Sequence, residues 1–136
     1  MGDAVNRSKV NAALLGAITV FLGTAFLLAP FIPDDSYISF RYAQNLANGS
    51  GLTFNPGEPP VEAYSNFLWI ILCALVSKFG ALPQVMPLVG LCFGVTSFLL
   101  IRQTLIRRAL DWKEVAMPLF LLAFSPAFVL YAVSAM

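Results

Sequence analysis

From Val10 to Ile32 the chain has no charged side chain. That stretch is as long as the roughly 20 apolar residues that an α-helix needs to cross a bilayer. A secretory signal is the alternative interpretation, because Arg7 and Lys9 give the chain a basic start. However, the apolar part of a signal is usually only about 7–15 residues long, and Ala29-Pro30-Phe31 is a poor cleavage site. The stretch therefore predicts a transmembrane helix.

Three further apolar blocks follow, so that spans are expected at about 10–32, 64–79, 85–101 and 115–136. The last block contains Pro118 and Pro126, which should kink or break it, and the chain stops inside it. Only 11% of the residues are charged, against about a quarter in soluble domains. The sequence predicts an all-α integral membrane protein, a polytopic helical bundle of three spans and a truncated fourth. The net charge of +1 does not suggest a nucleic-acid partner.

A polar loop, 33–64, separates the first two spans. Its first half, Ser36–Asn48, predicts an amphipathic helix, because Ile38, Tyr42 and Leu46 recur every four residues. Gly49 and Gly51 should end that helix, and the sequence Asn55-Pro56-Gly57 is typical of a turn. The loop is thus expected to carry a juxtamembrane helix that lies along the membrane surface, followed by a turn-rich segment.

The adjacent carboxylates Asp34 and Asp35 allow two interpretations. As structural residues, Asp35 would be the N-cap of the following helix, and Asp34 would favour its positive end. As functional residues, they would supply a general base, or oxygen ligands for a divalent cation such as Mg²⁺ or Mn²⁺. The chain has no histidine, so acid–base or metal chemistry must rest on its seven carboxylates.

The loop continues with elements that occur together in one known superfamily. They are Asp34-Asp35, Arg41-Tyr42, Leu46, Gly49-Ser50-Gly51-Leu52, Phe54-Asn55-Pro56-Gly57-Glu58, Val61-Glu62-Ala63-Tyr64-Ser65-Asn66 and Leu68-Trp69. In this order they resemble the first external loop of bacterial GT-C membrane glycosyltransferases, most closely the mycobacterial-type terminal arabinofuranosyltransferases and their relatives. The resemblance covers residues 34–69. Ala63 replaces the usual glycine, and two prolines follow Glu58.

The resemblance implies an inverting enzyme that moves a sugar from a polyprenyl-phosphate donor to a cell-envelope glycan or lipid acceptor. Asp34 would be the general base, with Asp35 as its alternative or helper, and the pair would be the place for any metal ion. Glu62 would accept hydrogen bonds from sugar hydroxyls or be a solvated loop carboxylate. Arg41 would pair with an aspartate within the loop or touch the donor phosphate. Tyr64 would bind substrate or anchor the loop at the interface. Such enzymes are several times longer, so the chain is expected to be an N-terminal fragment that is inactive alone.

The same family topology places the chain in the plasma (inner) membrane as a multi-pass protein, among membrane lipids, with the loop outside. Charge alone does not decide the orientation. With three spans before it, the connector at 102–114 would lie on the opposite side from the N-terminus. One side would then carry Arg7, Lys9 and Lys78, and the other would carry Arg41, Arg102, Arg107, Arg108 and Lys113.

Two other functions fit the same loop. The chain can be a non-catalytic remnant or assembly partner that keeps the loop without the chemistry, or a module that binds or transports the lipid carrier without needing Asp34. As a fragment, it is expected to leave Gly90, Gly94 and Ser97 without the helix partners that small and polar interface residues normally have.

Overall fold

All secondary structure in the described part of the chain is helical. The computed structural model describes residues 2–28, 32–59, 61–62, 64–108 and 110–134, with side chains from residue 6 onward. The helices are α1 (Gly2–Leu28), α2 (Asp34–Ala47), α3 (Phe67–Val76), α4 (Leu82–Arg107), α5 (Trp112–Ala123) and α6 (Pro126–Val133). These ranges contain no strand, which confirms the predicted all-α class.

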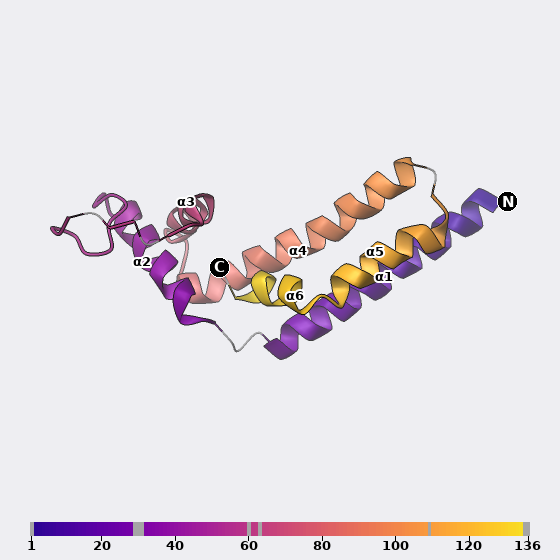
Figure 1. Cartoon of the computed structure of the whole chain (residues 1–136), viewed down its shortest axis with the longest axis horizontal. Helices are drawn as coiled ribbons and strands as arrows, with labels where there is room; N and C mark the ends of the chain where they lie inside the picture. Colours follow the sequence, from indigo (N-terminus) through magenta and orange to yellow (C-terminus); the bar gives the residue numbers. More distant parts are fainter. Residues whose placement is uncertain (1, 29–31, 60, 63, 109, 135–136) are drawn as a thin grey trace.

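The long helices α1 and α4 run side by side with the pair α5–α6 as a bundle, in which α4 is antiparallel to α1 and to α5–α6 (Figure 1). α1 from Asn6 to Leu28 and the whole of α4 are long and apolar enough to cross a membrane. The pair α5–α6 provides a third such segment when it is counted as one span. The block expected to span at 64–79 differs, because its helix, α3, has only 10 residues.

The last segment is broken at Pro126, as expected. The axes of α5 and α6 differ by 58°. Proline lacks the N–H that would continue the ladder, and its ring clashes with the preceding turn. Ser125 caps the new helix, since its Oγ accepts a hydrogen bond of 3.4 Å from the N–H of Phe128. Pro118, by contrast, lies inside a continuous α5.

The connector between α4 and α5 lies beside the start of α1. The N–H of Trp112 donates a 3.0 Å hydrogen bond to Asn6 Oδ1, and Lys9 Nζ lies 5.5 Å from the centre of the Trp112 ring. Arg102 in α4 donates a hydrogen bond to Asn11 Oδ1. The expectation that this connector and the N-terminus lie on opposite sides is therefore wrong. Sequence reasoning counted α3 as a crossing, and this reversed the direction of every later helix.

Because of this arrangement, the cations gather at one end of the bundle. Six of the eight lysines and arginines lie there: Arg7, Lys9, Arg102, Arg107, Arg108 and Lys113. Arg41 and Lys78 belong to the other end, where α2, α3 and the intervening loop lie. The sequence suggested three cations on one side of the membrane and five on the other, whereas the structure groups six at one end of the bundle and two at the other.

The interior of the bundle depends on two glycines of α4 that let other helices approach closely. Gly94 of α4 makes room for the ring of Phe21, which is fully buried and packs against Phe98 and Phe128 at centroid distances of 5.4 and 5.5 Å. Gly90 faces α6 in the same way. The expectation that these glycines lack partners is wrong, because α1 and α6 of the same chain supply them.

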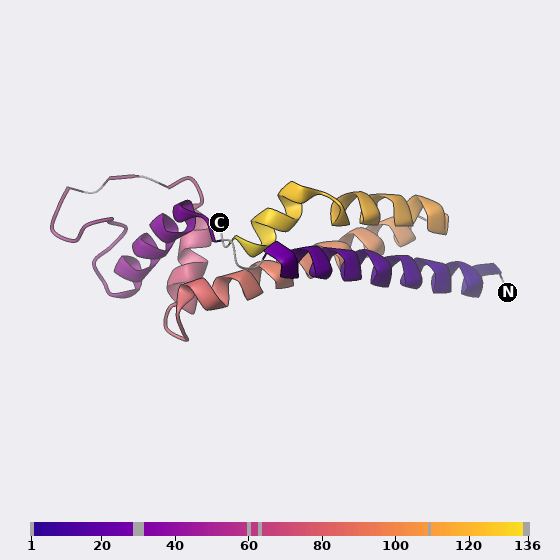
Figure 2. The same cartoon turned by 90° about the horizontal axis from the view of Figure 1, so that it is seen from below.

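At the other end of the bundle, α2 and α3 form a second packed unit (Figure 2). Its core contains Phe40 and Tyr42 of α2, Ile70 and Cys73 of α3, and Met86 of α4. α2 ends as predicted, because Gly49 has a φ of +82°, a conformation that glycine adopts without strain. The N–H groups of Gly49 and Ser50 close the helix end on the carbonyls of Leu46 and Asn45.

Candidate functional site

The two aspartates occupy the first turn of α2. The N-cap position belongs to Pro33, whose φ and ψ of −65° and 153° are extended, and no side chain caps the helix. Asp35 as the N-cap is therefore wrong by two positions, because the helix begins two residues closer to the N-terminus, directly after Pro33. Both carboxylates still lie where the positive end of the helix favours negative charge, and both are exposed.

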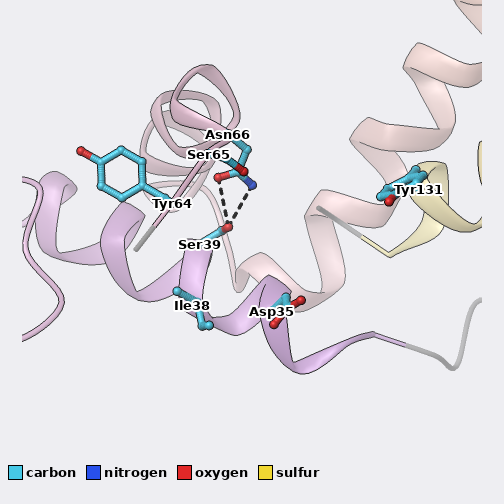
Figure 3. Close-up of a pocket in the computed structure, with 7 residues that line it drawn as sticks. All are labelled: Asp35, Ile38, Ser39, Tyr64, Ser65, Asn66 and Tyr131. Atoms are coloured by element: carbon cyan, nitrogen blue, oxygen red, sulfur yellow. Dashed lines mark hydrogen bonds between the residues drawn. The ribbon is translucent and has the colours of Figure 1, made fainter. Parts of the chain in front are cut away.

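Asp35 faces an open cleft of about 530 Å³ between α2, the segment before α3, and α6 (Figure 3). The residues that line it come from three separate parts of the chain: Asp35, Ile38, Ser39, Tyr64, Ser65, Asn66 and Tyr131. We call this hollow the Asp35 cleft. Apart from Ile38, every one of these side chains carries a hydroxyl, amide or carboxylate group that can form hydrogen bonds with a polar ligand.

Hydrogen bonds fix the walls of the Asp35 cleft. Asn66 Nδ2 donates a 3.0 Å hydrogen bond to Ser39 Oγ, which joins α2 to the residue that begins α3. The buried hydroxyl of Ser36 donates a 2.6 Å hydrogen bond to the carbonyl of Ser134, which joins α2 to the end of α6. Tyr131 of α6 stays 61% exposed at the rim. The cleft thus has a fixed polar side on α2 and an aromatic side on α6.

Asp34 points to a different hollow, of about 470 Å³, which it shares with Arg41, Gln44 and Phe54. The bonds of Arg41 run to the loop rather than to an aspartate. Its Nε donates to the carbonyl of Phe54 at 2.8 Å, and its Nη2 donates to Asn55 Oδ1 at 3.0 Å. Its guanidinium also lies 4.8 Å from the centre of the Phe54 ring. Arg41 is thus bonded within the loop, but to Phe54 and Asn55 and not to the aspartate that the sequence suggested.

The separation of the two carboxylates bears on a shared metal ion. Asp34 and Asp35 line different hollows, and a divalent cation needs several oxygen ligands around one point. Among the residues that the structure describes, no three histidine, cysteine, aspartate or glutamate side chains cluster as a metal site. A joint Mg²⁺ or Mn²⁺ site on this pair stays a prediction.

The segment after α2 is held to that helix by side chains. Tyr42 is fully buried, donates its hydroxyl hydrogen to the carbonyl of Val61, and meets Tyr64 edge-on at 4.9 Å between ring centroids. Gly57 has a φ of +90°, and the N–H of Glu58 bonds to the carbonyl of Asn55, which confirms the predicted turn. Tyr42 thus anchors this segment to α2.

The predicted site residues therefore fall into three groups. Asp35 and Tyr64 line the Asp35 cleft, while Asp34 and Arg41 line the neighbouring hollow. Glu62 is exposed on the loop and is not part of the cleft lining. Sequence reasoning missed Ser39, although it lies one helical turn after Asp35 and so on the same face. It also missed Tyr131, for which the local sequence gives no signal, because a tertiary contact brings α6 to the cleft.

An apolar groove of about 480 Å³ lies beside this region, between α3 and α4. It is lined by Leu68, Trp69, Ile71, Leu72, Leu75 and Phe93. A smaller hollow of about 170 Å³ shares Trp69 and Phe93 with the groove and Tyr131 with the Asp35 cleft. Polar and apolar recesses thus follow one another along the same side of the molecule.

Comparison with known proteins gives no assignment. No protein-family profile matches the chain, and no curated protein or solved structure is significantly similar to it.

Proposed function

We propose that the protein is part of an inverting membrane glycosyltransferase that uses a polyprenyl-phosphate sugar donor and a cell-envelope glycan or lipid acceptor. The observation that carries the proposal is the Asp35 cleft, in which an exposed carboxylate faces hydroxyl and amide side chains at one end of a bundle of candidate spans. The resemblance of residues 34–69 to the first loop of GT-C enzymes supports it independently. An apolar recess that adjoins the polar cleft also suits a ligand with a sugar at one end and a lipid at the other.

The chemistry needs one base. In a direct displacement, the oxygen of the acceptor hydroxyl forms a bond to the anomeric carbon of the sugar while the bond from that carbon to the phosphate oxygen breaks. The electron pair of the broken bond leaves on the phosphate, and the hydroxyl proton goes to a carboxylate. We assign this carboxylate to Asp35, because its position in the cleft gives an acceptor access to it.

Other groups have supporting roles in this proposal. Tyr64 and Tyr131 would contact the sugar or the lipid head, and Ser39 and Asn66 would hold the wall on which the acceptor rests. The seven residues lining the cleft include no lysine or arginine, so they do not themselves neutralise the departing phosphate. A role for Glu62 in binding sugar hydroxyls and a requirement for Mg²⁺ or Mn²⁺ stay predictions.

The proposal includes an orientation. Short loops rich in lysine and arginine stay on the cytoplasmic side of a membrane. The end with six of the eight cations would therefore be cytoplasmic, and the Asp35 cleft would open on the outer face of the plasma (inner) membrane. This orientation agrees with the external loop that the GT-C resemblance implies.

The test compares two neighbouring carboxylates. Membranes from cells that express the protein from its own gene are supplied with radiolabelled polyprenyl-phosphoryl pentoses and hexoses, and both transfer and retention of the donor are measured. Asp35→Asn should lower transfer at least about 100-fold without loss of donor retention, since a general base contributes about 10²–10⁴-fold. Asp34→Asn is the matched control, exposed in the same helical turn, and should keep most of the activity.

Each other outcome has a definite meaning. Loss in Asp34→Asn alone would contradict the choice of Asp35 and return the role of base to its neighbour. Donor retention with no transfer by the unaltered protein for any sugar would contradict the enzyme and favour a module that binds the lipid carrier. If the unaltered protein neither retains the donor nor transfers the sugar, a non-catalytic partner becomes the better description.

A further inference from the structure

Helix α3 has the composition of a membrane helix but only half the length. Phe67–Val76 contains no polar residue other than Cys73, and its 10 residues extend about 15 Å, against the roughly 30 Å of the hydrocarbon core. Large apolar side chains are nevertheless exposed on it: Leu68 is 80% exposed and Leu75 is 59% exposed. Phe79, just after the helix, is 88% exposed. The helix has an apolar face with no partner in the described part of the chain.

The opposite face of α3 is packed against other helices of the chain. Ile70, Cys73 and Ala74 are buried against α2 and the start of α4. Figures 1 and 2 show that α3 crosses the direction of α1 and α4 instead of running parallel to them. Because α3 is held in this direction, its exposed apolar side chains lie on the outside of the bundle at one end.

The connectivity of the bundle excludes a crossing by α3. Asn6 and Trp112 are hydrogen-bonded and so lie at the same level, which requires an even number of crossings between them. α1 and α4 provide two, and both have the length and hydropathy of spans. A third crossing by α3 would put Trp112 on the opposite side from Asn6. The segment between α1 and α4 therefore stays at one surface.

We propose that α3 lies in the plane of the membrane, within the interface, and binds the acyl chains of that leaflet through Leu68, Ile71, Leu72 and Leu75. These residues recur at the spacing of one helical face and line the apolar groove next to α4. The occupant is lipid because the groove ends on Phe93 of α4, which is 54% exposed on a candidate span, so groove and span share one continuous apolar surface. Exposed Lys78, directly after the helix, suits the head-group level above this surface.

The test measures depth in the bilayer. Single cysteines carrying an environment-sensitive fluorophore are introduced in the full chain with Cys73→Ala and Cys92→Ser, and proteoliposomes contain lipids with quenchers near the head group or deep in the acyl chains. Leu68→Cys and Leu75→Cys, about 10 Å apart along α3, should report one common shallow depth. Leu88→Cys and Leu99→Cys on α4, about 16 Å apart, are the reference pair and should report clearly different depths.

Two results would overturn the proposal. Depths of Leu68→Cys and Leu75→Cys that differ as much as their spacing would show that α3 crosses the bilayer. Absence of quenching at both positions would show that protein covers this face, whether a second copy or other helices. Phe79→Cys serves if either leucine variant fails to fold, since this side chain is exposed beyond the end of the helix.

Discussion

Gly90 of α4 lies directly against the main chain of Ala132 in α6, so closely that a Cβ on Gly90 would be 2.1 Å from the carbonyl oxygen of Ala132. No rotamer change can relieve such a contact, because the obstructing atom belongs to the backbone. Close approach of two helices through a small residue is a common way for membrane helices to associate. The contact holds α6, and with it Tyr131, in place at the cleft.

Gly90→Ala should therefore destabilise the bundle by about 1–3 kcal/mol, the usual cost of adding a methylene to a tightly packed site. Thermal unfolding of the protein in detergent measures this loss. Gly23→Ala is the matched control, because Gly23 lies in α1 with nothing within 4 Å of an added Cβ. If both variants unfold at the same temperature as the unaltered protein, the contact between α4 and α6 is not formed.

Tyr42→Phe should loosen the segment after the Asn55-Pro56-Gly57 turn. The change removes one buried hydroxyl and leaves the carbonyl of Val61 without that donor, at an expected cost of about 1 kcal/mol. Cleavage by a glutamate-specific protease after the exposed residue Glu62 should become faster. Tyr37→Phe, at a residue that is 50% exposed, is the control and should leave the cleavage rate unchanged. Equal rates in the two variants would contradict the anchoring role.

Arg41→Lys should release the turn about as fully as Arg41→Ala does. The guanidinium bonds two loop oxygens through Nε and Nη2 at once, and an ammonium group does not reproduce that fork. Hydrogen exchange of the Glu58 N–H, which closes the turn, should accelerate severalfold in both variants. Gln44→Ala on the same helix is the comparison and should not change that rate. Full protection in Arg41→Lys would mean that charge alone, and not geometry, holds the loop.

The orientation can be tested in intact cells. In a Cys73→Ala, Cys92→Ser background, a membrane-impermeant maleimide should label Ser50→Cys at the end of α2 at once. Ser8→Cys in α1 should react only after the membrane is permeabilised, because it lies at the end that carries six of the cations. Both serines are exposed, so access to the side chain is comparable. The reverse pattern would contradict the proposed external cleft.

Local signals in the sequence predicted the local structure well. The four-residue repeat of Ile38, Tyr42 and Leu46 gave α2, and the glycines and the Asn55-Pro56-Gly57 turn gave its end and the path of the loop. These features depend on backbone preferences that neighbouring residues determine. The N-cap was misassigned because an aspartate and a proline competed for adjacent positions, and the sequence alone did not rank them.

Features that depend on distant contacts could not be predicted in this way. Hydropathy identified α3 as apolar but did not show that it ends after 10 residues and packs across α2. The wrong expectation for the side on which the α4–α5 connector lies followed from counting α3 as a crossing. The cleft itself requires Tyr131, a residue that no periodicity relates to Asp35.

The hydrogen bond from Ser36 to the carbonyl of Ser134 joins residues 98 positions apart in the sequence, and it has a consequence for synthesis. A ribosome produces α2 and the loop well before α6, so the nascent chain first presents Asp35 with one wall of the recess absent. The complete recess forms once α6 has left the exit tunnel and has packed against Gly90. Assembly of this pocket therefore waits for the synthesis of α6, although α2 and the loop are made first.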